Sequence, residues 1–163
     1  MADLLLFDDS PLKTSDSVGV IIKTEENKYL LQHRWRRRGL YFPGFWGLFG
    51  GGVKVNEDPE AAARRELIEE LGFDPTALHL VMQFDFDFQP VKLNKIRRWF
   101  FATEISRAKI GDLHLTEGLG MKAFSAAEAL TKLRLVHYDA FALWVLESRH
   151  RLSPATQMGT KND

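Results

Sequence analysis

A helix with one apolar side, placed between segments typical of β-strands, is the feature that most constrains how this chain folds. Asp58 followed by Pro59 predicts its start, because the carboxylate caps free N–H groups and proline needs no N–H at the first helical position. Gly72 predicts its end. Apolar residues close to a four-residue spacing give the helix a side that is expected to pack on a core, and they are Ala63, Leu67, Ile68 and Leu71.

Segments rich in β-branched and aromatic residues lie on both sides of this helix. Strands are predicted at residues 17–24, 28–34, 45–49, 79–88, 96–105 and 121–124. A short helix opened by a capping box at residues 125–128 and a longer helix over residues 138–150 follow. Without an internal repeat or linker, this order predicts an α/β (α+β) fold with helices packed on a mixed sheet. We expect one domain over residues 1–163, with its core at about 17–150 and flexible ends at 1–12 and 153–163.

The composition excludes several kinds of site. The 22 Lys and Arg balance 22 Asp and Glu, so no global positive field draws the chain to duplex nucleic acid or to an anionic membrane. Without Cys, a thiolate nucleophile and a Cys-ligated metal are excluded, and oxygen or imidazole chemistry remains. The apolar run Leu4 to Phe7 lacks the positive charge of an export signal, and no stretch is long enough to cross a bilayer, so a cytoplasmic location is expected.

A second side of the predicted helix is acidic. Glu66, Glu69 and Glu70 stand at positions i, i+3 and i+4, which places their side chains within about 100° of one another around the helix. Like charges so placed repel, and a cation among them relieves the repulsion. Carboxylate oxygens select a hard cation, Mg²⁺ or Mn²⁺. The alternative is a solvated charged face on which Arg64 and Arg65 balance the glutamates.

The residues around the helix follow a longer pattern. Gly51, Glu57 and the run Arg65-Glu66-Leu67-Ile68-Glu69-Glu70-Leu71-Gly72-Phe73 match G-x5-E-x7-R-E-U-x-E-E-x-G-U, where U is apolar, at every fixed position. The segment resembles the Nudix box. Residues 30–34, 43–51, 117–118 and 124–125 also look like strands and a late loop of that family, so the resemblance covers about residues 18–146.

The resemblance implies the Nudix α/β/α sandwich and hydrolysis of a nucleoside diphosphate linked to a moiety X, with Mg²⁺ or Mn²⁺ as cofactor. In it, Arg65 is expected to pair with Glu57 or Glu69, so that Arg65 and Glu57 support the site without reacting. The metal ligands that the resemblance implies are Glu66, Glu69, Glu70 and the carbonyl of Gly50 or Gly51.

Hydrolysis of a pyrophosphate needs neutralised phosphate oxygens and an oriented water whose pKa is lowered. A carboxylate must then accept the proton of that water. Glu66 in the helix and Glu117 in the late loop are the two candidates, and both stay open. Together with Glu69 they are the residues expected to take part in catalysis.

Substrate contacts are expected beside the three consecutive glycines at residues 50–52. The segment 33–38 is strongly basic, and the resemblance favours Arg34 as a phosphate ligand. Trp46 is a candidate for stacking on a nucleobase, and Gly51 for close approach of the substrate. The expected partner is a small nucleotide, namely a nucleotide sugar, ADP-ribose or a nucleoside triphosphate. An RNA 5′ end and a non-catalytic nucleotide sensor are the alternatives, and a homodimer is left open as the assembly.

Overall fold

The computed structural model describes residues 15–37, 40, 42–87, 89–91 and 94–152. Its centre is one mixed sheet of six strands. The strands are β1 (Ser17–Thr24), β2 (Tyr29–His33), β3 (Trp46–Gly47), β4 (His79–Asp87), β5 (Lys95–Ile105) and β6 (Gly120–Phe124). The ends predicted to be flexible, residues 1–12 and 153–163, lie outside the described residues.

The strands are ordered β3, β2, β1, β5 and β4 across the sheet, and β6 pairs with β2. β1 and β5 run parallel, with Ser17 opposite Arg98 and Thr24 opposite Ile105. The other strand pairs are antiparallel. One parallel pair in an otherwise antiparallel sheet confirms the predicted mixed sheet.

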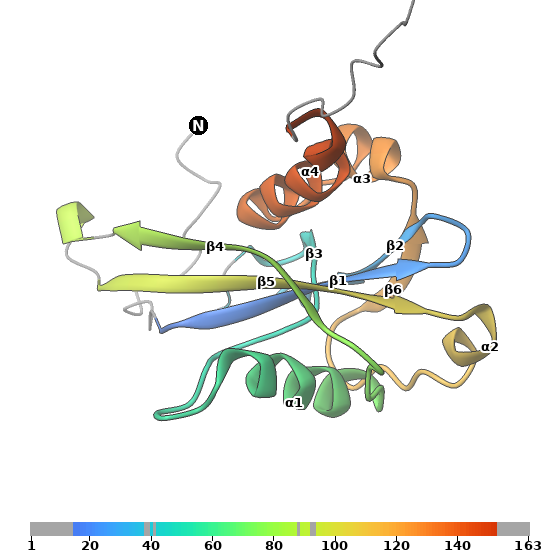
Figure 1. Ribbon diagram of the computed structural model, residues 1–163, viewed down its shortest axis with the longest axis horizontal. Helices are drawn as coiled ribbons and strands as arrows, with labels where there is room; N and C mark the ends of the chain where they lie inside the picture. The colour runs from blue at the N-terminus through green and yellow to red at the C-terminus, as the bar shows by residue number, and fades with distance from the viewer. Residues whose placement is uncertain (1–14, 38–39, 41, 88, 92–93, 153–163) are drawn as a thin grey trace, which may run out of the picture.

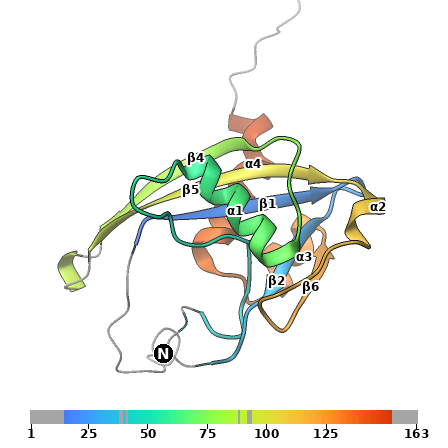
Figure 2. The same cartoon turned by 90° about the horizontal axis from the view of Figure 1, so that it is seen from below.

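Helices cover both faces of the sheet. α1 (Pro59–Leu71) lies on one face, and α3 (Ala126–Lys132) and α4 (His137–Leu152) lie on the other (Figure 1). Viewed from its own side, α1 crosses the sheet over β1 and β5, which it contacts (Figure 2). The three layers confirm the predicted α/β/α sandwich. Among the residues described, no helix has the length and apolar character needed to cross a membrane.

The first helix has the predicted bounds. The Asp58 carboxylate accepts hydrogen bonds from two N–H groups of the first turn, and Gly72 ends the helix with a left-handed φ of 65°. The prediction for Ile68 is wrong, because its side chain is 46% exposed. Each helical residue is rotated by about 100° from the one before it, so Ile68 falls outside the side that Leu67 buries. The buried apolar residues of α1 are Ala62, Ala63, Leu67 and Leu71.

Two other elements differ from the prediction. The strand expected at residues 45–49 is only β3, and Phe49 makes an isolated bridge to Val20 of β1. The single turns η1 (Gln89–Val91) and α2 (Arg107–Ile110) were not predicted. A helix of four residues is too short to show a hydrophobic period, which explains why the pattern missed α2.

Candidate active site

Residues 50–52, which we call the glycine loop, lie directly against β1 and α1. Gly50 has a φ of +132°, and a side chain there would place a Cβ 2.4 Å from the Val18 carbonyl oxygen. At Gly51, a Cβ would lie 2.7 Å from the carboxyl group of Glu66. At Gly50 the loop backbone therefore approaches β1 more closely than a residue with a side chain would allow, and at Gly51 a side chain would displace the Glu66 carboxyl group.

Glu70 is a buried carboxylate facing this loop. Glu70 is only 6% exposed. Its carboxylate accepts hydrogen bonds from the Gly50 N–H (2.9 Å) and from Gln32 Nε2 (3.4 Å). Burial raises the pKa of Glu70 to about 7, the Gly50 hydrogen bond opposes this, and the charges of Glu66 and Glu117 raise it further. In the described structure no cationic side chain is among its partners.

Glu66 lies one helical turn before Glu70. Its carboxylate accepts a hydrogen bond from Arg65 Nη1 at 2.7 Å. Burial raises the pKa of Glu66, the adjacent Arg65 lowers it, and the charges of Glu69 and Glu117 raise it. Glu117 is thus a neighbouring negative charge of both Glu66 and Glu70, and Glu66 is one of Glu70; we call these three residues the carboxylate cluster.

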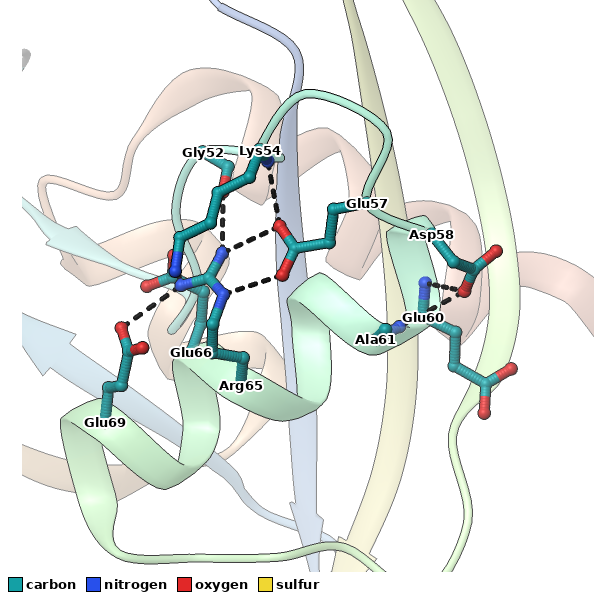
Figure 3. A network of polar contacts seen from close by, with 9 residues as sticks. All are labelled: Gly52, Lys54, Glu57, Asp58, Glu60, Ala61, Arg65, Glu66 and Glu69. Carbon is teal, nitrogen blue, oxygen red and sulfur yellow. Dashed lines mark hydrogen bonds and ion pairs between the residues drawn. The ribbon is translucent and has the colours of Figure 1, made fainter.

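Arg65 joins the glycine loop to the helix (Figure 3). Its guanidinium binds both carboxylate oxygens of Glu57, at 2.7 and 3.0 Å, and donates to the Gly52 carbonyl at 2.9 Å. Nη1 is shared by Glu66 at 2.7 Å and Glu69 at 3.1 Å. The hydrogen bonds from Arg65, aided by the Lys54 N–H, lower the pKa of Glu57 to about 2. Both expected pairings of Arg65, with Glu57 and with Glu69, are thus present.

Most of the chain matches one known protein family. The family described as NUDIX domain matches residues 13–144. The chain belongs to the Nudix family. Its Nudix box, residues 51–73, comprises the end of the glycine loop, α1 and the first residues after the helix.

Curated relatives match this Nudix domain over shorter stretches. The oxidized purine nucleoside triphosphate hydrolase of Danio rerio is 36% identical over 46% of this chain and 46% of its own length. The RNA pyrophosphohydrolase of Methylococcus capsulatus is 35% identical over 40% of this chain and 31% of its own. For the 8-oxo-dGTP diphosphatase of Proteus vulgaris the figures are 38%, 44% and 62%. The matches thus span less than two thirds of each of these three relatives.

Solved structures share the whole architecture. The MutT protein of Methanosarcina mazei Go1 superposes with a TM-score of 0.69 at 22% identity, covering 87% of this chain and 99% of that one. The dihydroneopterin triphosphate pyrophosphohydrolase of E. coli gives a TM-score of 0.64 at 20% identity, with 85% and 99% covered. At these identities the likeness concerns the Nudix fold alone.

The Nudix glutamates lie together, but their carboxylates point to protein partners. Glu66 and Glu69 both bind Arg65, whereas Glu70 binds Gly50. Within the part of the chain that the structure describes, no group of three or more Asp, Glu, His or Cys side chains is arranged to hold a metal ion. The donor set itself suits a hard cation, because the carboxylate cluster offers only oxygen ligands, and burial together with neighbouring negative charge raises the pKa of Glu66 and of Glu70.

The expected substrate residues fall into two places. Gly51 lies against Glu66 in the Nudix box. Trp46 instead stacks on His33, with ring centroids 4.7 Å apart, and packs in the core on the α3 and α4 face. Arg34 lies on that side too, because a Cβ placed on Gly47 would meet both Asp139 Oδ2, at 3.1 Å, and Arg34 Cδ, at 3.6 Å. The structure therefore groups Gly51 with the carboxylate cluster, and Arg34 and Trp46 with the opposite face of the sheet.

Sequence analysis did not single out two buried polar residues near these places. Gln32 follows three apolar residues of β2 and reaches Glu70. Asp139, in the first turn of α4, is 2% exposed and accepts hydrogen bonds from the Leu48 N–H at 2.9 Å and from Arg98 at 3.2 Å. Burial raises the pKa of Asp139. In each case the available signal was a polar residue within an otherwise apolar pattern.

Proposed function

We propose that this chain is a pyrophosphohydrolase that depends on a divalent metal and cleaves a nucleoside diphosphate linked to X by attack of water at phosphorus. The observation that carries the proposal is the carboxylate cluster beside the side-chain-free backbone of Gly50 and Gly51, in which Glu70 is buried, Glu66 is partly buried and Glu117 is exposed. Burying carboxylates close to other carboxylates destabilises the folded state, and groups perturbed in this way occur preferentially at functional sites.

Carboxylates alone would repel a phosphate substrate, so the proposal needs a cation. Mg²⁺ or Mn²⁺ would neutralise phosphate oxygens and lower the pKa of a water. The residues that would hold it are Glu66, Glu69, Glu70 and the carbonyl of Gly50. Arg65 Nη1 donates to only one oxygen of Glu66 and one of Glu69, so the second oxygen of each carboxylate would be the one to bind the cation, while Arg65 keeps its two bonds to Glu57.

The protein must also take up the proton of the attacking water. Glu117 is exposed, and in the described structure its carboxylate has no hydrogen bond or ion pair, whereas Glu66 is held by Arg65. A carboxylate free of partners reorients at low cost. We therefore favour Glu117 as the proton acceptor and assign Arg65 and Glu57 to bracing the glycine loop against α1.

Nucleoside triphosphates are the substrate class that we place first. The names of the relatives from Danio rerio and Proteus vulgaris refer to a nucleoside triphosphate and to 8-oxo-dGTP. An RNA 5′ end is the second candidate, favoured by the RNA pyrophosphohydrolase relative and by the exposed Arg36 and Arg37 after β2. Arg37 lies over the Trp35 ring at 4.2 Å, an arrangement that suits a phosphate beside a base.

A screen of the purified chain with Mg²⁺ against nucleoside triphosphates, nucleotide sugars, ADP-ribose and 5′-triphosphorylated RNA tests the proposal. We expect pyrophosphate release from at least one triphosphate and strong loss of that activity in Glu70→Gln. The matched control is Glu60→Gln, which removes an exposed carboxylate from the first turn of the same helix. Tight nucleotide binding without any product would instead identify a non-catalytic sensor.

A further inference from the structure

The loop that carries Glu117 is attached to the last turn of α1. The final carbonyl groups of a helix have no partner within the helix itself. Here the Glu70 carbonyl accepts a hydrogen bond from the Thr116 N–H at 2.9 Å, and the Glu69 carbonyl accepts one from the Thr116 hydroxyl at 2.8 Å. Thr116, the residue before Glu117, is therefore hydrogen-bonded to the same helical turn that carries Glu69 and Glu70.

The other side of this loop is attached to β2. Gly118 has a φ of +94°, and a Cβ there would lie 2.8 Å from the His33 carbonyl oxygen. The same oxygen accepts a hydrogen bond from the Leu119 N–H at 2.7 Å. Glu117 thus stands between a tie to α1 on one side and a tie to β2 on the other, although its own side chain is exposed.

Gln32 connects these two attachments. Gln32 is only 4% exposed. Its Nε2 donates to the Glu117 carbonyl at 3.3 Å and to the Glu70 carboxylate at 3.4 Å. Both partners are oxygen acceptors, so the amide nitrogen must face them. One buried side chain therefore contacts both the backbone of Glu117 and the carboxylate of Glu70.

We propose that Gln32 and Thr116 are positioning residues that hold Glu117 at a fixed place relative to Glu66 and Glu70. The proposal rests on the proposed function, because the place of Glu117 matters only if its carboxylate acts on the attacking water. An exposed side chain on an unattached loop would sample many positions. The two attachments confine the Cα of Glu117, so that only side-chain rotation is left to orient its carboxylate toward Glu66 and Glu70.

Two variants remove the side-chain hydrogen bonds of Thr116 and Gln32 without adding charge. Thr116→Val removes the hydroxyl and keeps the N–H, and Gln32→Met removes the amide at similar length. We expect kcat to fall by roughly 10- to 100-fold, as for a displacement of about 1 Å, with KM changed less than about threefold. Thr116→Ser, which keeps the hydroxyl, should restore near wild-type kcat. The matched control is Thr131→Val, which removes the same kind of bond, from a hydroxyl to the Ala127 carbonyl, in α3.

Amide hydrogen exchange of the metal-free protein gives a readout independent of activity. We expect faster exchange of the Leu119 N–H in Thr116→Val and Gln32→Met, and no change in Thr131→Val. Unchanged exchange, or faster exchange with unchanged kcat, would overturn the positioning proposal and leave the proposed function intact. A higher KM at constant kcat would overturn it as well. If Gln32→Met does not fold, Thr116→Val, at an exposed residue, decides alone. A wild-type chain that hydrolyses none of the nucleotides refutes the proposed function itself.

Discussion

Adding one methyl group at Gly51 should disable the site while leaving the fold in place. In Gly51→Ala the new Cβ would lie 2.7 Å from three atoms of the Glu66 carboxyl group. Carbon atoms in favourable contact are about 3.5–4.0 Å apart, so the carboxyl group must move by roughly 1 Å. A misplacement of about 1 Å can lower turnover about 100-fold. Gly51 has no left-handed φ, so backbone strain does not add to the effect.

The cost in stability should be small, because the group that moves is the end of a side chain. Arg65 would lose at most its bond to Glu66 and would keep those to Glu57 and Gly52. One hydrogen bond to a charged group contributes about 1.5–3 kcal/mol, and less where it is partly exposed. For a domain of this size, a loss of 1 kcal/mol lowers Tm by about 2–4 °C. We expect kcat to fall about 100-fold and Tm to fall by only a few degrees.

The next residue supplies the control. In Gly52→Ala the nearest atom to the new Cβ is Ser15 Oγ at 3.5 Å, an ordinary contact, so turnover should stay within about twofold of wild type. Both variants are assayed for nucleotide hydrolysis at saturating Mg²⁺ and melted by circular dichroism. Equal turnover of Gly51→Ala and Gly52→Ala would refute the inference that the carboxyl position of Glu66 matters.

Three further predictions follow from the carboxylates. Without metal, the pKa of Glu70 is about 7 in the folded state against 4.5 in the unfolded state, so protonation of Glu70 favours the folded state. The free energy of unfolding should therefore fall by about 3 kcal/mol as pH rises from below 4.5 to above 7. Glu70→Gln should abolish this loss in urea titrations, and an unchanged pH dependence would contradict the assignment. Glu117→Gln should lower turnover by roughly 10² to 10⁴ with metal affinity little changed, whereas Glu66→Gln should lose both, and a loss below about tenfold for Glu117→Gln would make Glu66 the proton acceptor. In ¹⁸O-labelled water the label should enter a phosphate product, and label in the nucleoside or X without labelled phosphate would exclude attack at phosphorus.

Local signals in the sequence predicted much of this molecule. The cap at Asp58 and the stop at Gly72 gave the bounds of α1, because both act within a few residues. The Nudix pattern predicted the pairings of Arg65 for the same reason, since all its partners lie in one 23-residue segment. The structure places Glu70 against Gly50 and Glu66 against Gly51, all within or next to that segment.

Contacts between distant segments were not predictable in this way. Nothing local to Gln32 indicates that it meets Glu70, 38 residues later, or Glu117, 85 residues later. The placement of Arg34 beside Asp139, on the face opposite α1, likewise depends on how α4 packs on the sheet. The direction in which each carboxylate points was also unpredictable, because it follows from the choice among Arg65, Gly50 and a cation.

The parallel pairing of β1 with β5 affects the order in which the site can form. During synthesis, the first 75 residues contain the whole Nudix box but only one of the two strands that α1 contacts. β1 can pair with β2 at once, but its parallel pairing with β5 must wait for residues about 80 positions further along, and Glu117 emerges later still. Contacts so far apart in sequence close slowly. A nascent chain released before residue 117 would therefore expose its acidic helix without the loop that completes the carboxylate cluster.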